Sequence, residues 1–104
     1  MNEGSIAVSA ASSGDNTLLA AQGAGVKIRV LGILLVAASA VNVRLESGAG
    51  GTAMTGVIPL EANTGFVLPF ADFGWGSTAA NALLNLELSA AVQVSGVLLY
   101  RTHT

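Results

Sequence analysis

The side chains best suited to binding a ligand lie together in residues 66–75, FVLPFADFGW. This segment holds all three phenylalanines and the only tryptophan of the 104-residue chain. Phe70, Phe73 and Trp75, beside the carboxylate of Asp72, could form a platform for a sugar ring or a partner's side chain, because C–H groups stack on aromatic rings while hydroxyls bond the acid. Aromatics are scarce elsewhere in the chain. We therefore favour the alternative, in which these rings plug the end of the fold or the seam between subunits.

The residues that carry most enzyme chemistry are sparse. The only histidine, His103, is next to the last residue, whereas a Ser-His-Asp triad needs an imidazole that is firmly held. The six acidic residues are scattered singly and there is no cysteine, so we expect neither a calcium nor a zinc ligand set. The sequence predicts no catalytic residue, no metal site and no cofactor, and a protein that is not an enzyme.

A glycine-rich stretch, GAGGTA at residues 48–53, fits the pattern G-x-G-x-x-A of dinucleotide-binding loops. That chemistry needs a helix directly after the loop, with its N-terminus aimed at the pyrophosphate. Gly56 and Pro59 make the following residues a poor helix. We therefore interpret residues 48–53 as a hairpin loop in which glycine supplies positive φ angles.

The elements that position these residues are predicted to be strands. Apolar and polar side chains alternate over 26–30, 41–46, 84–89 and 92–101, and Gly, Asn and Ser clusters separate such stretches. The pattern predicts an all-β domain over residues 16–104, with about eight short antiparallel strands in a two-sheet, jelly-roll-like sandwich that forms oligomers. Residues 1–15, rich in Gly, Ser and Ala, are expected to form a flexible N-terminal arm that orders on docking.

The most hydrophobic segment, VKIRVLGILLVAASA at residues 26–40, starts with alternation and then becomes apolar on both faces. A strand buried on both sides in so small a domain needs a second layer beyond its own core. We therefore expect one of two sets to meet another subunit: Leu34 and Val36, or else Leu31, Ile33 and Leu35. The nine-residue apolar run is far shorter than the roughly 20 residues of a membrane-spanning helix.

The composition points to a surface that is covered by other subunits. Hydrophobic residues make up 52% of the chain and charged residues only 10%, against about 25% in typical soluble domains. We prefer buried subunit contact to membrane insertion as the explanation, because obligate interfaces are unusually hydrophobic. The formal net charge of −2, with only four Lys and Arg, argues against a nucleic-acid partner.

The order of the sequence blocks resembles a group of small tailed-bacteriophage virion proteins. The resemblance rests on KIRVLGILLVAASAVNVRLESG (27–48), TAMTGVIPL (52–60), GFVLPF with a following GW (65–75) and ALLNLELSAAVQVSGVLLY (82–100). It implies a jelly-roll virion component that forms a homotrimer, above all a capsid decoration (cement) protein bound to the major capsid or another virion protein. It implies assembly in the host cytoplasm and residence in the virion. The alternative is a tail-associated or receptor- and carbohydrate-binding module that uses Phe70, Phe73 and Trp75.

Overall fold

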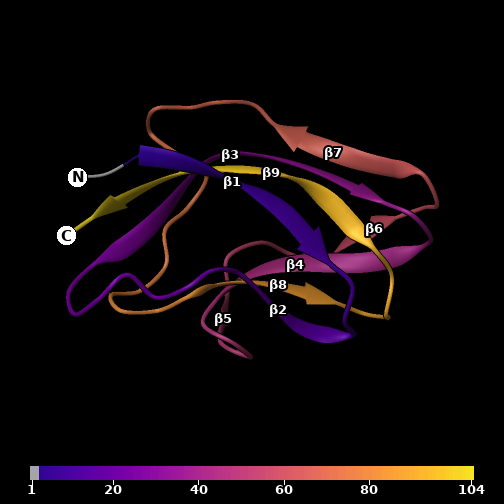
Figure 1. Ribbon diagram of the computed structural model, residues 1–104, viewed down its shortest axis with the longest axis horizontal. Helices are drawn as coiled ribbons and strands as arrows, with labels where there is room; N and C mark the ends of the chain where they lie inside the picture. The colour runs from indigo at the N-terminus through magenta and orange to yellow at the C-terminus, as the bar shows by residue number, and fades with distance from the viewer. Residues whose placement is uncertain (1–2) are drawn as a thin grey trace.

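The computed structural model describes residues 3–104, which form strands joined by loops (Figure 1). No described segment is a helix long and apolar enough to cross a membrane. The strands of the described residues are β1 (Glu3–Ala10), β2 (Gly14–Leu19), β3 (Lys27–Ala37), β4 (Val41–Ser47), β5 (Thr52–Ala53), β6 (Ile58–Leu60), β7 (Thr64–Leu68), β8 (Leu84–Leu88) and β9 (Val94–His103).

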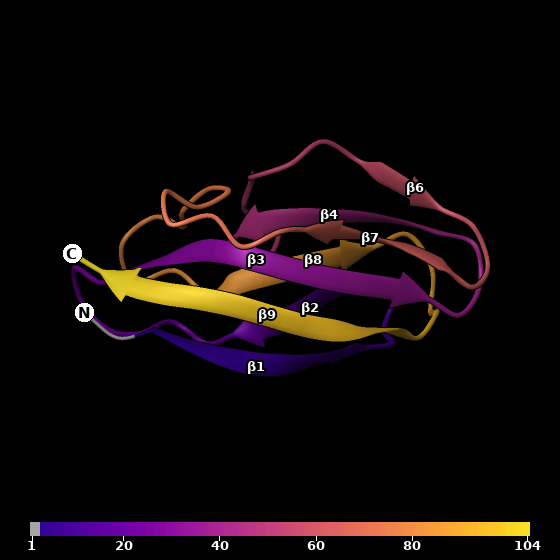
Figure 2. The ribbon, with the colours of Figure 1, turned by 90° about the horizontal axis from the view of Figure 1, so that it is seen from above.

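The strands form two antiparallel sheets that pack face to face as a sandwich (Figure 1). The first sheet has the order β1-β9-β3-β7, and Figure 2 looks onto its outer face. The second sheet has the order β2-β8-β4, with β5 and β6 both paired to the far side of β4. The predicted all-β, two-sheet fold is confirmed.

Alternation of side chains explains most of the strands. In β4 the inward positions Val41, Val43 and Leu45 are buried, and in β8 all three leucines are buried. The segment of residues 52–60 is divided into the two short strands β5 and β6. Its middle leaves the sheet because the N–H groups of Met54 and Thr55 both turn back to the carbonyl of Leu45.

The core lies between the sheets and consists of aliphatic side chains from both. Ile28, Leu35, Leu84, Leu86 and Leu98 are among the largest side chains that are completely buried. Complete burial of one such side chain stabilises the folded state by about 1.5–3 kcal/mol. Aliphatic side chains therefore fill the core. Phe66 packs against it, whereas Phe70, Phe73 and Trp75, which were expected to be needed there, are exposed.

The N-terminal segment is part of the sandwich in this structure. Residues 3–10, within the stretch expected to be a flexible arm, form β1 and pair with β9 from Glu3↔Arg101 to Ala10↔Val94 without a register shift. The predicted boundary between residues 15 and 16 falls inside β2. The small residues of β1 suggested an arm, but Val8 and Ala10 point into the core and are buried there.

Candidate functional site

Strand β3 presents different residues to its two sides, and this settles which set faces outward. Leu34 and Val36 are 38% and 43% exposed on the outer face of the first sheet. Ile33 and Leu35 point the other way and are buried in the core of the same chain, at 3% and 0% exposure. Leu34 and Val36 thus remain candidates for contact with another subunit, whereas Ile33 and Leu35 are corrected to core residues.

Leu31 is also corrected, for a different reason. A β-bulge between Val30 and Gly32 shifts the register of β3 against β9 and breaks the simple alternation. Leu31 lies at this bulge and is only 3% exposed. Its carbonyl accepts a hydrogen bond of 2.9 Å from the N–H of Ala71, in the loop that follows β7. It is therefore enclosed within the chain and offers no surface to a subunit.

A continuous row of apolar side chains crosses all four strands on the outer face of the first sheet. Ala7, Val97, Leu34 and Val67 form a row, because Ala7 pairs with Val97, Val97 with Leu34, and Leu34 with Val67. All four are exposed. We call this row, together with Val36 and Phe70, the apolar face. Sequence reasoning missed Val97, although VLL at 97–99 is apolar on both sides of its strand just as residues 31–36 are.

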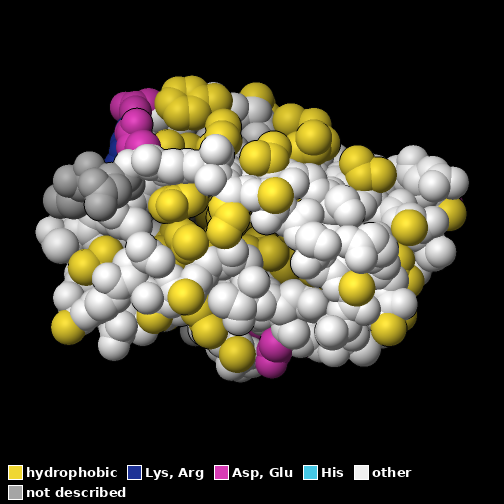
Figure 3. Space-filling view, in the orientation of Figure 1, with side chains coloured by type: hydrophobic (Ala, Val, Ile, Leu, Met, Phe, Trp, Pro, Cys, Tyr) yellow, Lys and Arg dark blue, Asp and Glu magenta, His cyan; other side chains and the backbone are white. Residues whose placement is uncertain are grey.

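A groove runs along the apolar face where the sheet meets the loop after β7. It has a volume of about 160 Å³. Leu34, Val67, Phe70, Val97 and Leu99 line it. In Figure 3 hydrophobic side chains gather along the upper side of the molecule, over β7 and the loop that follows it. Hydrophobic surface that is contiguous over several strands, and not scattered singly, is typical of an interaction site.

The segment from residue 69 to residue 76, here called the aromatic loop, is fixed to the end of the sheet by hydrogen bonds. The N–H of Trp75 donates to the carbonyl of Val30 at 2.7 Å, and its indole Nε1 donates to the carbonyl of Pro69 at 2.8 Å. Arg29 Nη1 donates to the carbonyl of Phe73 at 3.0 Å, and its guanidinium lies 5.8 Å from the centre of the Phe73 ring. Arg101 donates to the carbonyl of Asp72 at 3.1 Å.

The rings of the aromatic loop point into solvent in the single chain. Phe73 is 87% exposed, Phe70 62% and Trp75 43%. The interpretation that these rings plug the end of the sandwich is therefore wrong. A seam between subunits and a ligand platform both remain open. The carboxylate that was expected to help a platform is engaged, because Asp72 Oδ1 accepts a hydrogen bond of 2.7 Å from Arg101.

The outer face of the second sheet is polar and gathers three acids that looked scattered in the sequence. Asp15, Glu46 and Glu87 come from the adjacent strands β2, β4 and β8, and carboxylate oxygens of all three lie within 4.8 Å of one another. Oxygen ligands of this kind suit hard cations. Among the described residues, however, no buried polar side-chain atom lacks a hydrogen-bond partner. The buried carboxylate of Glu46 is therefore bonded by groups of the protein itself.

Arg44 offsets part of the negative charge of this acidic group, and Asn85 donates hydrogen bonds to two of its carboxylates. The Arg44 guanidinium pairs with Oε2 of the completely buried Glu46, and Asn85 Nδ2 donates to Glu46 Oε1 at 2.8 Å and to Asp15 Oδ1 at 2.9 Å. Desolvation, followed by the negative charges of Glu46 and Asp15, raises the pKa of Glu87 above its usual value of 4.5. Folding therefore favours the protonated form of Glu87.

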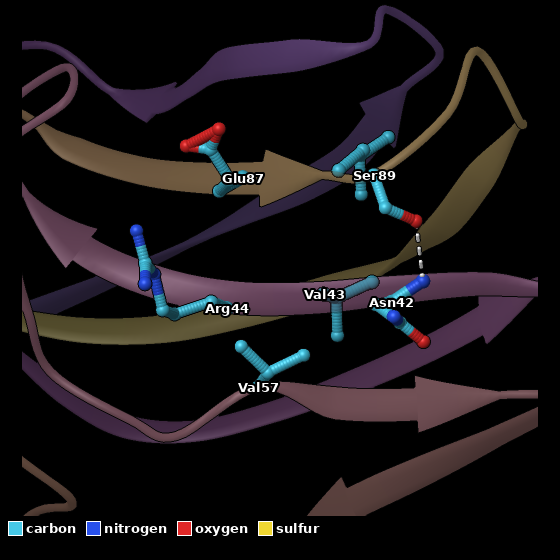
Figure 4. Close-up of a pocket in the computed structure, with 7 residues that line it drawn as sticks. Asn42, Val43, Arg44, Val57, Glu87 and Ser89 are labelled. Carbon is cyan, nitrogen blue, oxygen red and sulfur yellow. Dashed lines mark hydrogen bonds between the residues drawn. The ribbon is translucent and has the colours of Figure 1, made fainter.

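A shallow pocket of about 310 Å³ lies on the same side, between β4, β8 and the segment before β6 (Figure 4). Arg44 and Glu87 project from neighbouring strands, and Val57 lies on the other side of β4 from Glu87. The N–H of Asn42 donates to Ser89 Oγ at 2.9 Å. The pocket offers one cation that is already paired with Glu46, the carboxylate of Glu87 and the exposed side chain of Val57, and none of these is an activated nucleophile.

His103 is held more firmly than its place near the end of the chain suggested. It is the last residue of β9, pairs with Lys27 and has its Nε2 2.9 Å from Ser77 Oγ. A serine nucleophile activated by histidine needs a third group that orients the imidazole. Within residues 3–104 no carboxylate is hydrogen-bonded to this ring, so the geometry assembles two members of a triad and not three.

The glycine-rich loop is a hairpin, as interpreted from the sequence. Residues 48–51 connect β4 to β5, and Ser47 pairs with Thr52. Gly48 and Gly50 have φ angles of 84° and 63°, which glycine adopts without strain. The N–H of Gly50 donates to Asp15 Oδ1 at 3.2 Å, so the loop folds toward the acidic group of the second sheet.

No family model matches this sequence, and no curated protein matches it.

Proposed function

We propose that this chain is a non-enzymatic structural subunit of a tailed-phage virion, a capsid decoration protein that acts as a homotrimer on the major capsid or another virion protein. The observation that carries the proposal is the apolar face. A row of hydrophobic side chains crosses the outer side of the first sheet from Ala7 on β1 to Val67 on β7. The resemblance of the sequence to small virion proteins supplies the kind of assembly.

The exposed apolar surface is comparable in size to a protein-binding patch. From their exposed fractions, Phe70, Phe73 and Trp75 present about 400 Å² of aromatic surface. The exposed aliphatic side chains of the apolar face add about 200 Å². The total approaches the roughly 800 Å² that each partner contributes to a standard protein–protein interface. It also reaches the upper end of the range of about 300–600 Å² for the largest patch on a monomer.

The contrast between the two faces of the sandwich supports docking by one side only. The second sheet satisfies its own polar groups, with Arg44, Asn85 and the hairpin residue Gly50 bound to its acids. The first sheet exposes side chains that water does not solvate well. A subunit that seals this side against a neighbour removes that cost, and its polar side then faces solvent on the outside of a shell.

The test combines localisation with a charge placed on each face. Purified virions of the phage that encodes the chain should contain it, and cryo-electron microscopy should place it on the capsid surface with the first sheet inward. Leu34→Lys should abolish incorporation and reduce the mass of the free oligomer. Asn42→Lys, which adds the same charge to the exposed outer face of the second sheet, should change neither. Virions that lack the protein, or that incorporate the Leu34→Lys variant normally, refute the proposal.

A second candidate, the receptor- or carbohydrate-binding module, is favoured by the way the aromatic loop presents its rings. Phe73 is 87% exposed although Arg29 and three backbone contacts hold the loop rigid. Pre-organised aromatics bind at a low entropic cost. Trp75→Ala separates the candidates: loss of binding to host glycans with an unchanged oligomer supports the module, and dissociation of the oligomer supports the seam.

A further inference from the structure

Strand β1 forms a long open edge of the first sheet. It pairs with β9 over eight residues without a bulge, and no strand lies on its other side (Figure 2). Within the described part of the chain, the backbone hydrogen bonds of loops and turns do not involve β1. The outward N–H and C=O groups of this strand therefore form a row that another strand can pair with.

The other edges of the two sheets carry the features by which proteins prevent such pairing. β7 is five residues long and is followed directly by Pro69. β2 has a register shift between Thr17 and Leu19. β5 has two residues, and β6 has three with Pro59 at its centre. Among the edges of the described sandwich, β1 is thus the longest, and neither a proline nor a bulge interrupts it.

The sequence of β1, EGSIAVSA, is also low in charge. Its single charged residue, Glu3, lies at the start of the strand and accepts a hydrogen bond of 2.8 Å from Arg101 Nε. Ile6, which lies opposite the buried Leu98, is 36% exposed at the edge although it points toward the inner side of the sheet. A β1 edge that stays in water therefore leaves both backbone groups and part of an isoleucine uncovered.

We propose that β1 pairs antiparallel with β1 of a second copy, so that two four-stranded sheets join into one eight-stranded sheet. Antiparallel pairing of a strand with its own copy is a twofold contact, which is self-complementary by symmetry. Ser5, Ala7 and Ser9 place small side chains on the outer side of the seam, and Ile6 and Val8 meet on the inner side. The two Glu3 residues lie at opposite ends and do not repel each other.

Continuity with the apolar face favours a second copy as the occupant of this edge. The row from Ala7 to Val67 ends at β1, so the pair of β1 strands joins it to the same row of the second copy. The joint sheet presents one docking surface of twice the width. The contact is distinct from the threefold contact of the proposed function. Edge pairing alone gives a dimer, the threefold contact alone gives a trimer, and the two together give an assembly of six chains.

The test is a charge at Ile6, which blocks the edge and leaves the apolar face unchanged. Inward-pointing charges are a known protection of edge strands. By light scattering at micromolar concentration the wild-type mass should be an even multiple of 10.3 kDa, and Ile6→Lys should halve it. Ile6→Glu should do the same. An equimolar mixture of the two variants should restore the wild-type mass, because opposite charges then meet across the seam. Circular dichroism confirms that both variants fold.

The outcomes of this test are separate from those of the proposed function. A wild-type trimer or monomer overturns edge pairing, and so does an unchanged mass for folded Ile6→Lys. A wild-type dimer that Ile6→Lys converts to monomer supports edge pairing and counts against the homotrimer. Leu34→Lys serves as the matched control, because it places the same charge on the apolar face and should leave the twofold contact intact. If the Lys and Glu variants of Ile6 both fail to fold, the hydrogen exchange of the wild type decides. Edge pairing then requires that the outward amides of β1 exchange slowly in the associated protein. Their exchange must become fast when the protein is diluted and the two copies separate.

Discussion

Leu34 and Leu35 are adjacent leucines on opposite faces of β3, and their replacement by alanine should have different consequences. Leu35 is completely buried between the sheets, so Leu35→Ala should lower the free energy of unfolding by about 3 kcal/mol, within the range of 2–5 kcal/mol for core leucines. In a domain of this size that corresponds to a melting temperature lower by roughly 15 °C. The loss comes from the core and is expected at every protein concentration.

Leu34→Ala removes the same atoms from a side chain that is 38% exposed beside Val97 and Val67. Three lost carbons at about 0.8 kcal/mol each, reduced by the exposed fraction, give a loss of about 1.5 kcal/mol. No closed cavity remains, so no cavity cost is added. If the apolar face is an interface, association also stabilises the wild type, by up to about 1.4 kcal/mol per tenfold rise in concentration. Part of that dependence should disappear in Leu34→Ala.

The assay is urea denaturation, monitored by far-ultraviolet circular dichroism. It is run at protein concentrations near 1 and 100 μM, about two decades apart, so that the effect of association on the unfolding midpoint can be measured. The unfolding midpoint of Leu35→Ala should be low at both concentrations and should shift between them as much as that of the wild type. The midpoint of Leu34→Ala should shift less. Equal losses for the two variants at the lower concentration would refute the assignment of faces. An unchanged concentration dependence in Leu34→Ala would refute the role of the apolar face in association.

Three further predictions concern the second sheet and a close backbone contact. Asn85→Leu should cost about 1.5–3 kcal/mol in urea denaturation at pH 7, because the buried carboxylate of Glu46 loses a hydrogen bond; a loss below 0.5 kcal/mol, about the size of a typical surface substitution, contradicts this. The raised pKa of Glu87 means that its ionised form opposes folding, so its contribution to stability rises as the pH falls from 7 through that pKa toward 4.5. Glu87→Gln should therefore be more stable than the wild type at pH 7, with the difference shrinking toward pH 4, and a difference that grows on acidification contradicts the sign. Gly96→Ala should destabilise the β3–β9 pair by about 1–3 kcal/mol, since an added Cβ would overlap the carbonyl oxygen of Leu34; a wild-type melting temperature would disprove the close approach.

Strand positions were predictable from the sequence because alternation is a local property. The buried positions of β4 and β8 follow directly from V-x-V-x-L and L-x-L-x-L. The outward side of β3 was not predictable, because residues 31–36 are apolar on both sides and the periodicity gives no preference. The bulge at Leu31 depends on the register of β3 against β9, strands that are about 70 residues apart in sequence.

The acidic group of the second sheet was missed for a related reason. Asp15, Glu46 and Glu87 become neighbours only through the strand order β2-β8-β4, which a single sequence does not reveal. Each of the three does occupy an outward position of its strand, and that much could have been derived. The exposure of Phe73 could not have been, because it depends on where Arg29 and Arg101 hold the aromatic loop.

The structure also changes how the low charge of the chain is understood. Of its four basic and six acidic side chains, half are joined in ion pairs: Arg44 with Glu46, and Arg101 with Glu3 and Asp72. The first pair lies on the polar second sheet, and the second group fixes the aromatic loop to β1 and β9 at the rim of the apolar face. Charged side chains therefore lie at the rim of the apolar face, whereas the row from Ala7 to Val67 at its centre carries no charge. An interface with such an uncharged centre selects its partner by shape, and rim charges mainly affect the association rate. High salt should accordingly leave the assembly intact, whereas a single lysine at Leu34 should break the contact made by that face.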